Sequence, residues 1–383
     1  MSKFARIILV NLATILCFSV VGCGKDAAGS FSSPTKTPVQ SATVAPTGTQ
    51  AATPTANAQT QTPTQAPTAT ATANPTTTPT VVEGEGAVLW QVAVPDALTM
   101  SYVIKTKNNK IIVIDGGGDS DSGTYAGKKY PKKEIEELLK VLKGATGQQV
   151  PTVDAWIFTH CHSDHVNVFS HLMNNMAGTV KVGKVYYNFP SDQYLYNAGM
   201  GKDENSTLSK FKRAINTLSK NQIVIVEQGK SYTVDNVTFN IILAPDESIK
   251  DATFLSNAIN ESSLVFDMKL GGQRVLFLGD LGPYSNSRFL AAIRKTESET
   301  VDVVQLGHHG SQGLTISYYW ALRPKACLWS TPTWLWNNDN GKGYNTGPWE
   351  TITLYNYLVR KGVDKHYVMK DGTLKLEFPL DLG

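Results

Sequence analysis

The residues with the clearest capacity for chemistry stand together in one short segment. His160, His162, Asp164 and His165 place four ligand-type side chains within six residues. Neutral imidazoles and carboxylates are the ligands that Zn²⁺ and similar ions prefer in proteins. His160 and His162 lie two apart in an extended stretch and can point the same way. Asp164 and His165, at the turn into a helix, can face a second ion. One histidine would fit an ordinary polar loop, but these four predict a site for one or two Zn²⁺ ions, with Mn²⁺ as the alternative.

The pattern His160-x-His162-x-Asp164-His165 resembles the signature of the metallo-β-lactamase superfamily. The resemblance covers the whole domain, because later motifs follow in the family's order. It implies an α/β fold of the αββα sandwich type, in which two mixed sheets flanked by helices hold the metals at one edge.

The resemblance also implies two further ligands. Asp280, after an apolar run at 275–278, matches the carboxylate that bridges the two ions. The last ligand histidine matches His308 or His309, which stand just before Gly310 and Ser311. We favour His308 as the ligand and His309 as a group that contacts the substrate, and the reverse assignment stays open.

One ligand of the family pattern is missing from this sequence. A histidine is expected between the helix after the cluster and the bridging aspartate. His171 is the nearby histidine, and it is better explained as an ordinary helix residue. One metal would then be held by His160, His162 and Asp280 alone, or with help from a nearby polar side chain. The candidates for that help are Asn260, Ser262 and Ser263.

Three segments, 260–265, 276–280 and 307–311, resemble the hydrolase domain of ComEC-type competence proteins. They are also similar to secreted phosphodiesterases of the same fold, including choline-releasing teichoic acid esterases. The start of the domain, at 94–97, departs from the competence-type pattern, so a role in DNA transport is not implied. We expect a phosphodiesterase that uses a metal-bound hydroxide, because metals lower the pKa of bound water.

In that mechanism Asp164 and Asp280 orient the hydroxide, His309 (or His308) stabilises the oxyanion, and Ser311 contacts a phosphate oxygen. The expected substrate contains a phosphodiester, as in a cell-wall polymer, a lipid head group or a nucleic acid. Two alternatives remain open. One is a lactam or ester hydrolase, and the other is a non-catalytic surface binding module with a vestigial metal site. No protein partner is implied.

The elements around these residues should form two halves, each a sheet with outer helices. Residues 153–158 read as a buried strand before the histidine cluster, and residues 166–176 as a helix after it. Turn residues at 108–109 and 235–236 predict hairpins. Asp371-Gly372 predicts a third hairpin between the last two strands, 366–370 and 373–378.

The N-terminal residues are expected to direct the protein to secretion and to attach the domain to the membrane. Residues 1–23 combine Lys3 and Arg6 with a short apolar run, the pattern of a secretory signal. Their end resembles a bacterial lipobox, which implies cleavage before Cys23 and lipidation of its thiol. An ordinary signal peptide is the alternative. The Thr/Pro/Ala-rich residues 24–85 predict a disordered linker, and residues 86–383 the hydrolase domain. The protein is therefore expected outside the cytoplasm, anchored to the membrane by lipid.

Charge and the remaining aromatic and sulfur residues limit the other possibilities. The formal net charge is +3, which gives no electrostatic footprint for nucleic acid. Cys161 and Cys327 are expected to be buried thiols rather than a disulfide. A cluster of aromatic residues near the C-terminus fits either a ligand surface or a loop packed on the core. Its members are Trp329, Trp334, Trp336, Tyr344 and Trp349.

Overall fold

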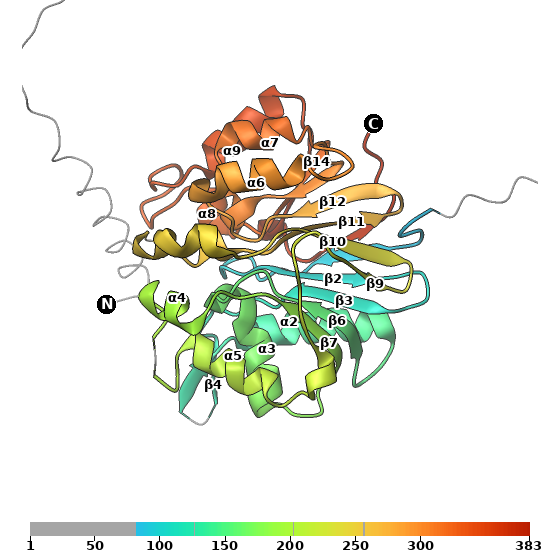
Figure 1. The fold of residues 1–383 in the computed structure, drawn as a ribbon, viewed down its shortest axis with the longest axis vertical. Coiled ribbons are helices and arrows are strands. Elements are labelled where there is room, and N and C mark those ends of the chain that lie inside the picture. The colour runs from blue at the N-terminus through green and yellow to red at the C-terminus, as the bar shows by residue number, and fades with distance from the viewer. Residues whose placement is uncertain (1–81, 126, 202, 256) are drawn as a thin grey trace, which may run out of the picture. The chain divides into compact units, whose positions relative to one another are not determined.

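The computed structural model describes residues 82–125, 127–201, 203–255 and 257–383, which contain two seven-stranded sheets packed face to face. The predicted signal peptide, Cys23 and the predicted linker up to residue 81 lie outside the described residues. Helices cover the outer face of each sheet, as Figure 1 shows. The predicted αββα sandwich is therefore confirmed.

The first sheet has the order β16-β1-β2-β3-β6-β7-β8. Its strands β16, β1, β2 and β3 are antiparallel, and β3, β6, β7 and β8 are parallel. The bounds are β1 Val88–Gln91, β2 Ser101–Lys105, β3 Ile111–Asp115, β6 Thr152–Ile157, β7 Lys181–Tyr187, β8 Ile223–Ile225 and β16 Leu374–Glu377.

The second sheet has the order β15-β14-β13-β12-β11-β10-β9 and repeats this mixed design. Strands β12 to β15 are parallel, and β9 to β12 are antiparallel. The bounds are β9 Ser231–Val234, β10 Val237–Leu243, β11 Val265–Leu270, β12 Gln273–Phe277, β13 Val303–Gln305, β14 Ala326–Trp329 and β15 Lys365–Val368. A separate small hairpin joins β4 Gly123–Tyr125 to β5 Lys128–Tyr130.

The helices pack in two outer layers. The α-helices are α2 Lys132–Thr146, α3 Ser163–Asn175, α4 Asp192–Asn197, α5 Thr207–Ile215, α6 Asn286–Ile293, α7 Ile316–Ala321, α8 Thr333–Trp336 and α9 Thr351–Arg360. Short 3₁₀ helices are η1 Lys220–Gln222, η2 Glu247–Phe254, η3 Asn260–Ser262, η4 Pro283–Ser285, η5 Gly307–Gly310 and η6 Met369–Asp371. Figure 1 shows α2, α3 and α5 on the outer side of the first sheet and α6, α7 and α9 on the outer side of the second. No helix in the described ranges is both long and apolar enough to cross a membrane.

Both faces of each sheet are apolar because both are covered. In β3, Ile111 and Val113 pack in the cluster under the outer helices, whereas Ile112 and Ile114 pack in the cluster between the sheets. Successive strand residues point to opposite faces, so a continuous apolar run is what a strand buried on both sides requires. Cys161 and Cys327 are buried free thiols, as expected.

Two of the three predicted hairpins are confirmed, and the third is wrong. The pairs β2–β3 and β9–β10 are antiparallel neighbours, and their turns place Asn109 at φ 60° and Asp235 at φ 57°. Asn and Asp tolerate this left-handed region better than most residues. Strands β15 and β16 do not pair. β15 extends the parallel half of the second sheet, and Gly372, at φ 97°, directs the chain to the first sheet, where β16 pairs with β1.

The described chain begins before the predicted start of the domain. The backbone N–H of Gly84 donates to the carbonyl oxygen of Asn236, and the carbonyl oxygens of Glu83 and Gly84 accept from Gly272 and Gly271. We had assigned these residues to the linker. The hydrogen bonds instead attach them to the hairpins of the second sheet.

Candidate metal centre

The predicted ligands come from the carboxyl ends of parallel strands in both sheets. His160 and His162 follow β6, and Asp164 and His165 form the first turn of α3. In the second sheet Asp280 follows β12, and the two histidines at 308–309 follow the adjacent strand β13. Because parallel strands end at the same edge of a sheet, the site assembles where these edges face each other.

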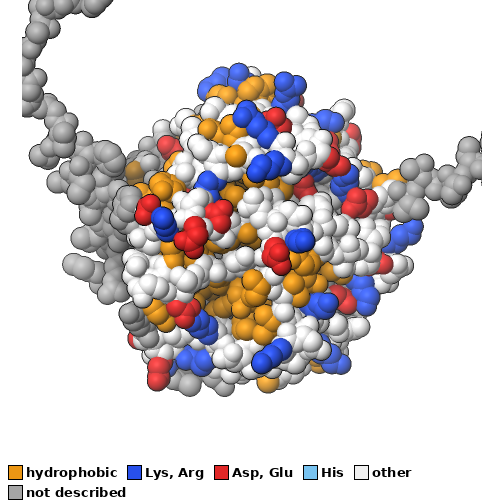
Figure 2. Space-filling model, in the orientation of Figure 1, with side chains coloured by type: hydrophobic (Ala, Val, Ile, Leu, Met, Phe, Trp, Pro, Cys, Tyr) orange, Lys and Arg blue, Asp and Glu red, His pale blue; other side chains and the backbone are white. Residues whose placement is uncertain are grey.

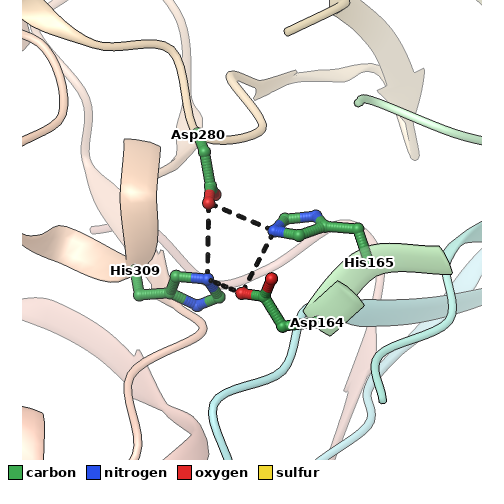
Figure 3. Close-up of side chains that lie close together, drawn as sticks. All are labelled: Asp164, His165, Asp280 and His309. Carbon is green, nitrogen blue, oxygen red and sulfur yellow. Dashed lines mark hydrogen bonds and ion pairs between the residues drawn. The ribbon is translucent and has the colours of Figure 1, made fainter. Parts of the chain in front are cut away.

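Four side chains converge in a buried cluster, drawn in Figure 3. Asp280 Oδ2 lies 3.1 Å from His165 Nε2 and 3.5 Å from His309 Nε2. Asp164 Oδ2 lies 2.9 Å from His309 Nε2 and 3.5 Å from His165 Nε2. Two imidazole nitrogens therefore alternate with two carboxylates around one point.

A second cluster shares the same aspartate. His160 Nε2 lies 3.1 Å from His162 Nδ1 and 3.7 Å from Asp280 Oδ2. The ligand atoms of these three residues all lie within 4.8 Å of one another. The structure thus brings together both halves of the predicted two-metal site, with Asp280 at their junction.

The outward ring nitrogens of two cluster histidines are fixed by oxygen acceptors. His309 Nδ1 lies 2.7 Å from the carbonyl oxygen of Ser330, which can only accept, so Nδ1 donates. His165 Nδ1 lies 2.8 Å from Asp115 Oδ2. In the neutral ring these bonds leave the lone pair on Nε2, the nitrogen that faces the cluster.

Asp115, at the end of β3, positions two of the histidines. Its fully buried carboxylate also accepts from the Thr159 backbone N–H at 2.8 Å and from Thr159 Oγ1 at 2.7 Å. Because that hydroxyl hydrogen is used, Thr159 Oγ1 is left to accept from His160 Nδ1, 3.1 Å away. A carboxylate behind a ligand histidine fixes its tautomer and raises its basicity. Our sequence reasoning assigned no role to Asp115; the local signal for it is the Asp-Gly-Gly-Gly segment at 115–118, which ends the apolar run of β3.

The loop that carries Asp280 is held by hydrogen bonds from strand β13 and from the loop before β11. The side chain of buried Gln305 accepts from Leu278 N at 2.8 Å and donates to Gly279 O at 3.0 Å. The Asp280 backbone N–H donates to Ser263 Oγ at 3.1 Å. Gly279 has φ 56°, and a Cβ there would lie 2.8 Å from Thr159 Cβ, so only glycine fits.

Burial and the carboxylates set the charge state of the four-residue cluster. Burial alone would raise the pKa of Asp280, but His165 and His309 hold it well below its usual range. Burial alone would lower the pKa of His309, yet Asp280 and Asp164 raise it to about 10. The same carboxylates, with Asp115, raise the pKa of His165 well above its usual value, again against burial. Without a bound metal, these negative carboxylates therefore favour the protonated forms of His165 and His309.

The donor set fits divalent metal ions of the Zn²⁺ type. It offers imidazole nitrogens and carboxylate oxygens, which are the usual ligands of such ions. Asp280 Oδ1 is buried and has no hydrogen-bond partner among the described residues. An unpartnered buried carboxylate oxygen is costly unless a cation or a donor compensates it, so this atom suits a metal ligand.

The structure reverses our preference between the two adjacent histidines. His309, not His308, reaches the four-residue cluster. Both residues have positive φ, 50° for His308 and 55° for His309, in a left-handed turn that ends at Gly310. Thr331 Oγ1 donates to the His309 carbonyl at 2.6 Å and stabilises the turn. His308 lies beside it, half-buried, with Nδ1 unpartnered among the described residues.

The remaining candidates lie outside the clusters. Ser311 Oγ accepts from the Glu350 backbone N–H at 3.3 Å, so it anchors the C-terminal loop. His171 stacks on Tyr130, with ring centroids 4.4 Å apart, consistent with the prediction that it is not a ligand. Among the candidates for the missing ligand, Ser263 Oγ already accepts from Asp280 N, as described above, and Ser262 Oγ donates to the Ile259 carbonyl at 2.6 Å. The Oδ1 atom of buried Asn260 has no hydrogen-bond partner in the described part of the chain.

The aromatic residues near the C-terminus differ in how deeply they are buried. Trp329 is fully buried in β14, and its ring contacts Trp336 at 5.2 Å between centroids. Trp334 and Trp349 form a half-buried edge-to-face pair at 4.9 Å. Tyr344 is 70% exposed. The two best-packed tryptophans thus belong to the core.

Comparison with known proteins shows which family the chain resembles. Residues 94–232, which include the histidine cluster, match the model of the metallo-beta-lactamase superfamily. The match spans 139 of the 383 residues, and over this part the chain is similar to that superfamily. The chain is also a distant homologue of ComE operon protein 3 from Bacillus subtilis (strain 168), with 24% identity over 223 residues. The match covers 57% of this chain and 25% of the relative, so this chain spans about a quarter of the relative's length.

The solved structures that this chain resembles are remote in sequence. Zn²⁺-bound PqqB from Methylobacterium extorquens is 11% identical, with a TM-score of 0.45 over 76% of this chain and 99% of that chain. The metallo-β-lactamase fold protein YhfI from Bacillus subtilis is 11% identical, with a TM-score of 0.43 over the same shares, 76% and 99%.

Proposed function

We propose that this chain is a metal-dependent hydrolase that cleaves phosphodiesters. The observation that carries the proposal is the pair of ligand clusters joined at Asp280, which are buried except for half-buried His162. When bound in such a site, Zn²⁺ or Mn²⁺ ions supply Lewis acidity and lower the pKa of water toward neutrality.

The protein's own groups supply orientation. Asp115 and the Ser330 carbonyl keep ring nitrogens of His165 and His309 directed at the cluster. Gln305 and Ser263 fix the backbone on either side of Asp280. Preorganised groups of this kind need no rearrangement during reaction, which is the main source of electrostatic catalysis. His308, whose ring centroid lies 6.2 Å from that of His309, is the side chain best placed to contact a substrate oxygen.

The two alternatives have less support. A vestigial binding module does not require a carboxylate such as that of Asp115, which orients two ligand histidines. A lactam hydrolase is disfavoured by the tandem His308-His309 segment, which resembles that of competence-type proteins instead. The similarity to ComE operon protein 3 supports the same branch.

We also propose that the protein acts outside the cytoplasm, held to the membrane by a lipid on Cys23. The support is the N-terminal sequence pattern alone. Labelling of cells with a radioactive fatty acid should mark the wild-type chain and not the Cys23→Ala variant. Equal labelling of both would contradict the anchor without affecting the hydrolase proposal.

The test of the activity uses the full chain. Metal content is measured by mass spectrometry after dialysis against Zn²⁺ or Mn²⁺, and turnover is measured on bis-p-nitrophenyl phosphate. We expect bound metal and turnover in the wild type, loss of turnover in Asp164→Ala, and no loss in Asp364→Ala, which changes an exposed aspartate before β15. Metal-loaded wild-type protein without turnover on this and other phosphodiesters would refute the proposal.

A further inference from the structure

A polar groove of about 780 Å³ lies along α3, outside the two ligand clusters. One wall is α3 itself, and the others come from the loop after β3, the hairpin strand β5 and the helix α5. Its lining combines basic side chains with amide and hydroxyl groups, among them Lys128, Lys129, Lys210, Arg213, Asn167 and Ser170. We call it the α3 groove.

The α3 groove begins next to the metal centre. The α3 residues that line it recur every three or four positions, at 167, 170–171 and 174–175, and therefore form one face of the helix. Asp164 precedes Asn167 by three residues and starts the same face. Asn167 also donates to the carbonyl oxygen of Gly118 at 3.1 Å, which closes the near end. At about 1.5 Å per residue, the stripe from Asn167 to Asn175 runs about 12 Å away from the cluster.

The charged lining is basic in balance. Lys128, Lys129, Lys210 and Arg213 line the groove against the two aspartates 119 and 121. Among the described residues, none of these four cations forms an ion pair with a carboxylate. Lys128 Nζ donates instead to Asn205 Oδ1 at 2.7 Å, and Arg213 donates to the Glu204 carbonyl. Their positive charge is available to an anionic ligand.

The uncharged lining is rich in hydroxyl and amide groups. Ser170 is only 2% exposed, yet its Oγ has no partner in the described part of the chain, and the same holds for Asn167 Oδ1. Buried polar atoms normally have partners, so these two call for a ligand or water. Amides and hydroxyls pair with the hydroxyls of a polyol, whereas nucleic-acid grooves present aromatic faces for the bases. Here Tyr130 uses one ring face to stack on His171, at an interplanar angle of 9°.

The charge pattern on one face of the molecule also gives a nucleic acid no support. Figure 2 shows lysines and arginines interspersed with acidic side chains on the face it presents, without a continuous basic track across it. Single-stranded nucleic acids need such a track together with stacking platforms.

We propose that the α3 groove is a subsite for a polyol phosphate chain, which it binds beyond the phosphodiester that is presented to the metal centre. The lysines and Arg213 bind the phosphates. The amide side chains and Ser170 form hydrogen bonds with the hydroxyls. The effect of this subsite on catalysis rests on the proposed function. Binding of the polyol phosphate chain to the groove does not depend on turnover.

The test compares two charge-matched double variants of the full chain. Lys129→Ala/Lys210→Ala removes two groove cations, and Lys140→Ala/Lys220→Ala removes two exposed lysines elsewhere. The probes are a synthetic glycerol phosphate oligomer, an oligothymidylate of equal charge, and bis-p-nitrophenyl phosphate. We expect kcat/KM on the oligomer to fall about tenfold or more in the groove variant only, with the small diester unaffected in both.

Binding to chelator-treated protein separates this proposal from the hydrolase proposal. Calorimetric binding of the glycerol phosphate oligomer that is lost only in the groove variant, without hydrolysis by the metal-loaded wild type, would support the subsite and refute the activity. Hydrolysis of the oligomer at equal rates by both variants would refute the subsite alone. Preferred, groove-dependent binding of the oligothymidylate would refute the polyol assignment.

Discussion

At the scale of single residues, the site depends on a carboxylate that is not itself in either cluster. Asp115 accepts from His165 directly and orients His160 through the Thr159 hydroxyl. One side chain therefore controls which nitrogen of two ligand histidines carries the proton. Both ligand clusters share this control, because His165 belongs to one and His160 to the other.

Replacement of Asp115 tests this control. In Asp115→Asn a neutral amide replaces the negative carboxylate behind the imidazoles. Metal affinity should therefore fall about 10- to 100-fold. Competition with a chromogenic chelator measures the change. Asp154→Asn is the matched control, since Asp154 also accepts from a backbone N–H, that of Ile111, but contacts no ligand. Equal affinity of Asp115→Asn and wild type would contradict the positioning role.

The adjacent histidines give a second prediction at this scale. His309→Gln removes a ring nitrogen from the four-residue cluster, so the metal content measured by mass spectrometry should fall. His308→Gln should keep the metal and lower turnover. The opposite pattern would restore the assignment that we favoured from sequence.

These residues show where sequence reasoning works and where it stops. The four ligands at 160–165 are close in sequence, so their spacing alone indicates a metal site. The choice of His309 depends on two successive left-handed residues and on an acceptor at Ser330, more than twenty positions away. Asp115 depends on β3 and β6 being parallel neighbours, which no local pattern reveals.

At the scale of elements, hairpins were predictable and sheet membership was not. Turn residues with positive φ specify β2–β3 and β9–β10 locally. The Asp371-Gly372 turn carries the same local signal, yet it connects two sheets. Parallel pairing of β15 with β14 and antiparallel pairing of β16 with β1 are interactions over long sequence distances, and they override the turn.

The two confirmed hairpins are also tied to each other across the sheets. Asp235, in the β9–β10 turn, accepts from Thr106 Oγ1 at 2.7 Å and from the Asn108 side chain at 2.7 Å. These hydrogen bonds hold the pKa of Asp235 below its usual value. A group whose pKa is lowered on folding stabilises the fold above its unfolded pKa and loses that effect as pH falls through the folded value.

Asp235→Ala should therefore destabilise the protein in a pH-dependent way. Because the site is exposed, we expect a modest loss of about 1 kcal/mol at neutral pH. The difference from wild type should shrink progressively below about pH 5, as the carboxylate is protonated. Urea unfolding across this range measures it, with Asp364→Ala as the surface control. A difference that grows on acidification would contradict the sign of this argument.

At the scale of the whole domain, the metal centre joins two halves of the chain. The first sheet and α3 supply His160, His162, Asp164 and His165, and the second sheet supplies Asp280 and His309. The motif order along the sequence, combined with the family resemblance, was enough to predict this architecture. The order of the strands was not, since it is set by pairing between segments that are not neighbours in sequence, from about twenty residues apart for β13 and β14 to more than two hundred for β1 and β16.

Because the ligands come from both sheets, metal should stabilise the folded domain as a whole. An ion that binds the folded state alone adds RT ln(1 + [L]/Kd), or about 2.7 kcal/mol when free metal exceeds Kd a hundredfold. Thermal unfolding of the full chain should therefore occur at a lower temperature after chelation and recover on addition of Zn²⁺. His309→Gln should recover less than wild type, since one bond between the halves is gone, while Lys140→Ala/Lys220→Ala should recover fully. If chelation left the unfolding temperature unchanged in protein shown to hold metal beforehand, the prediction would be contradicted, because an ion that binds only the folded state must raise that temperature.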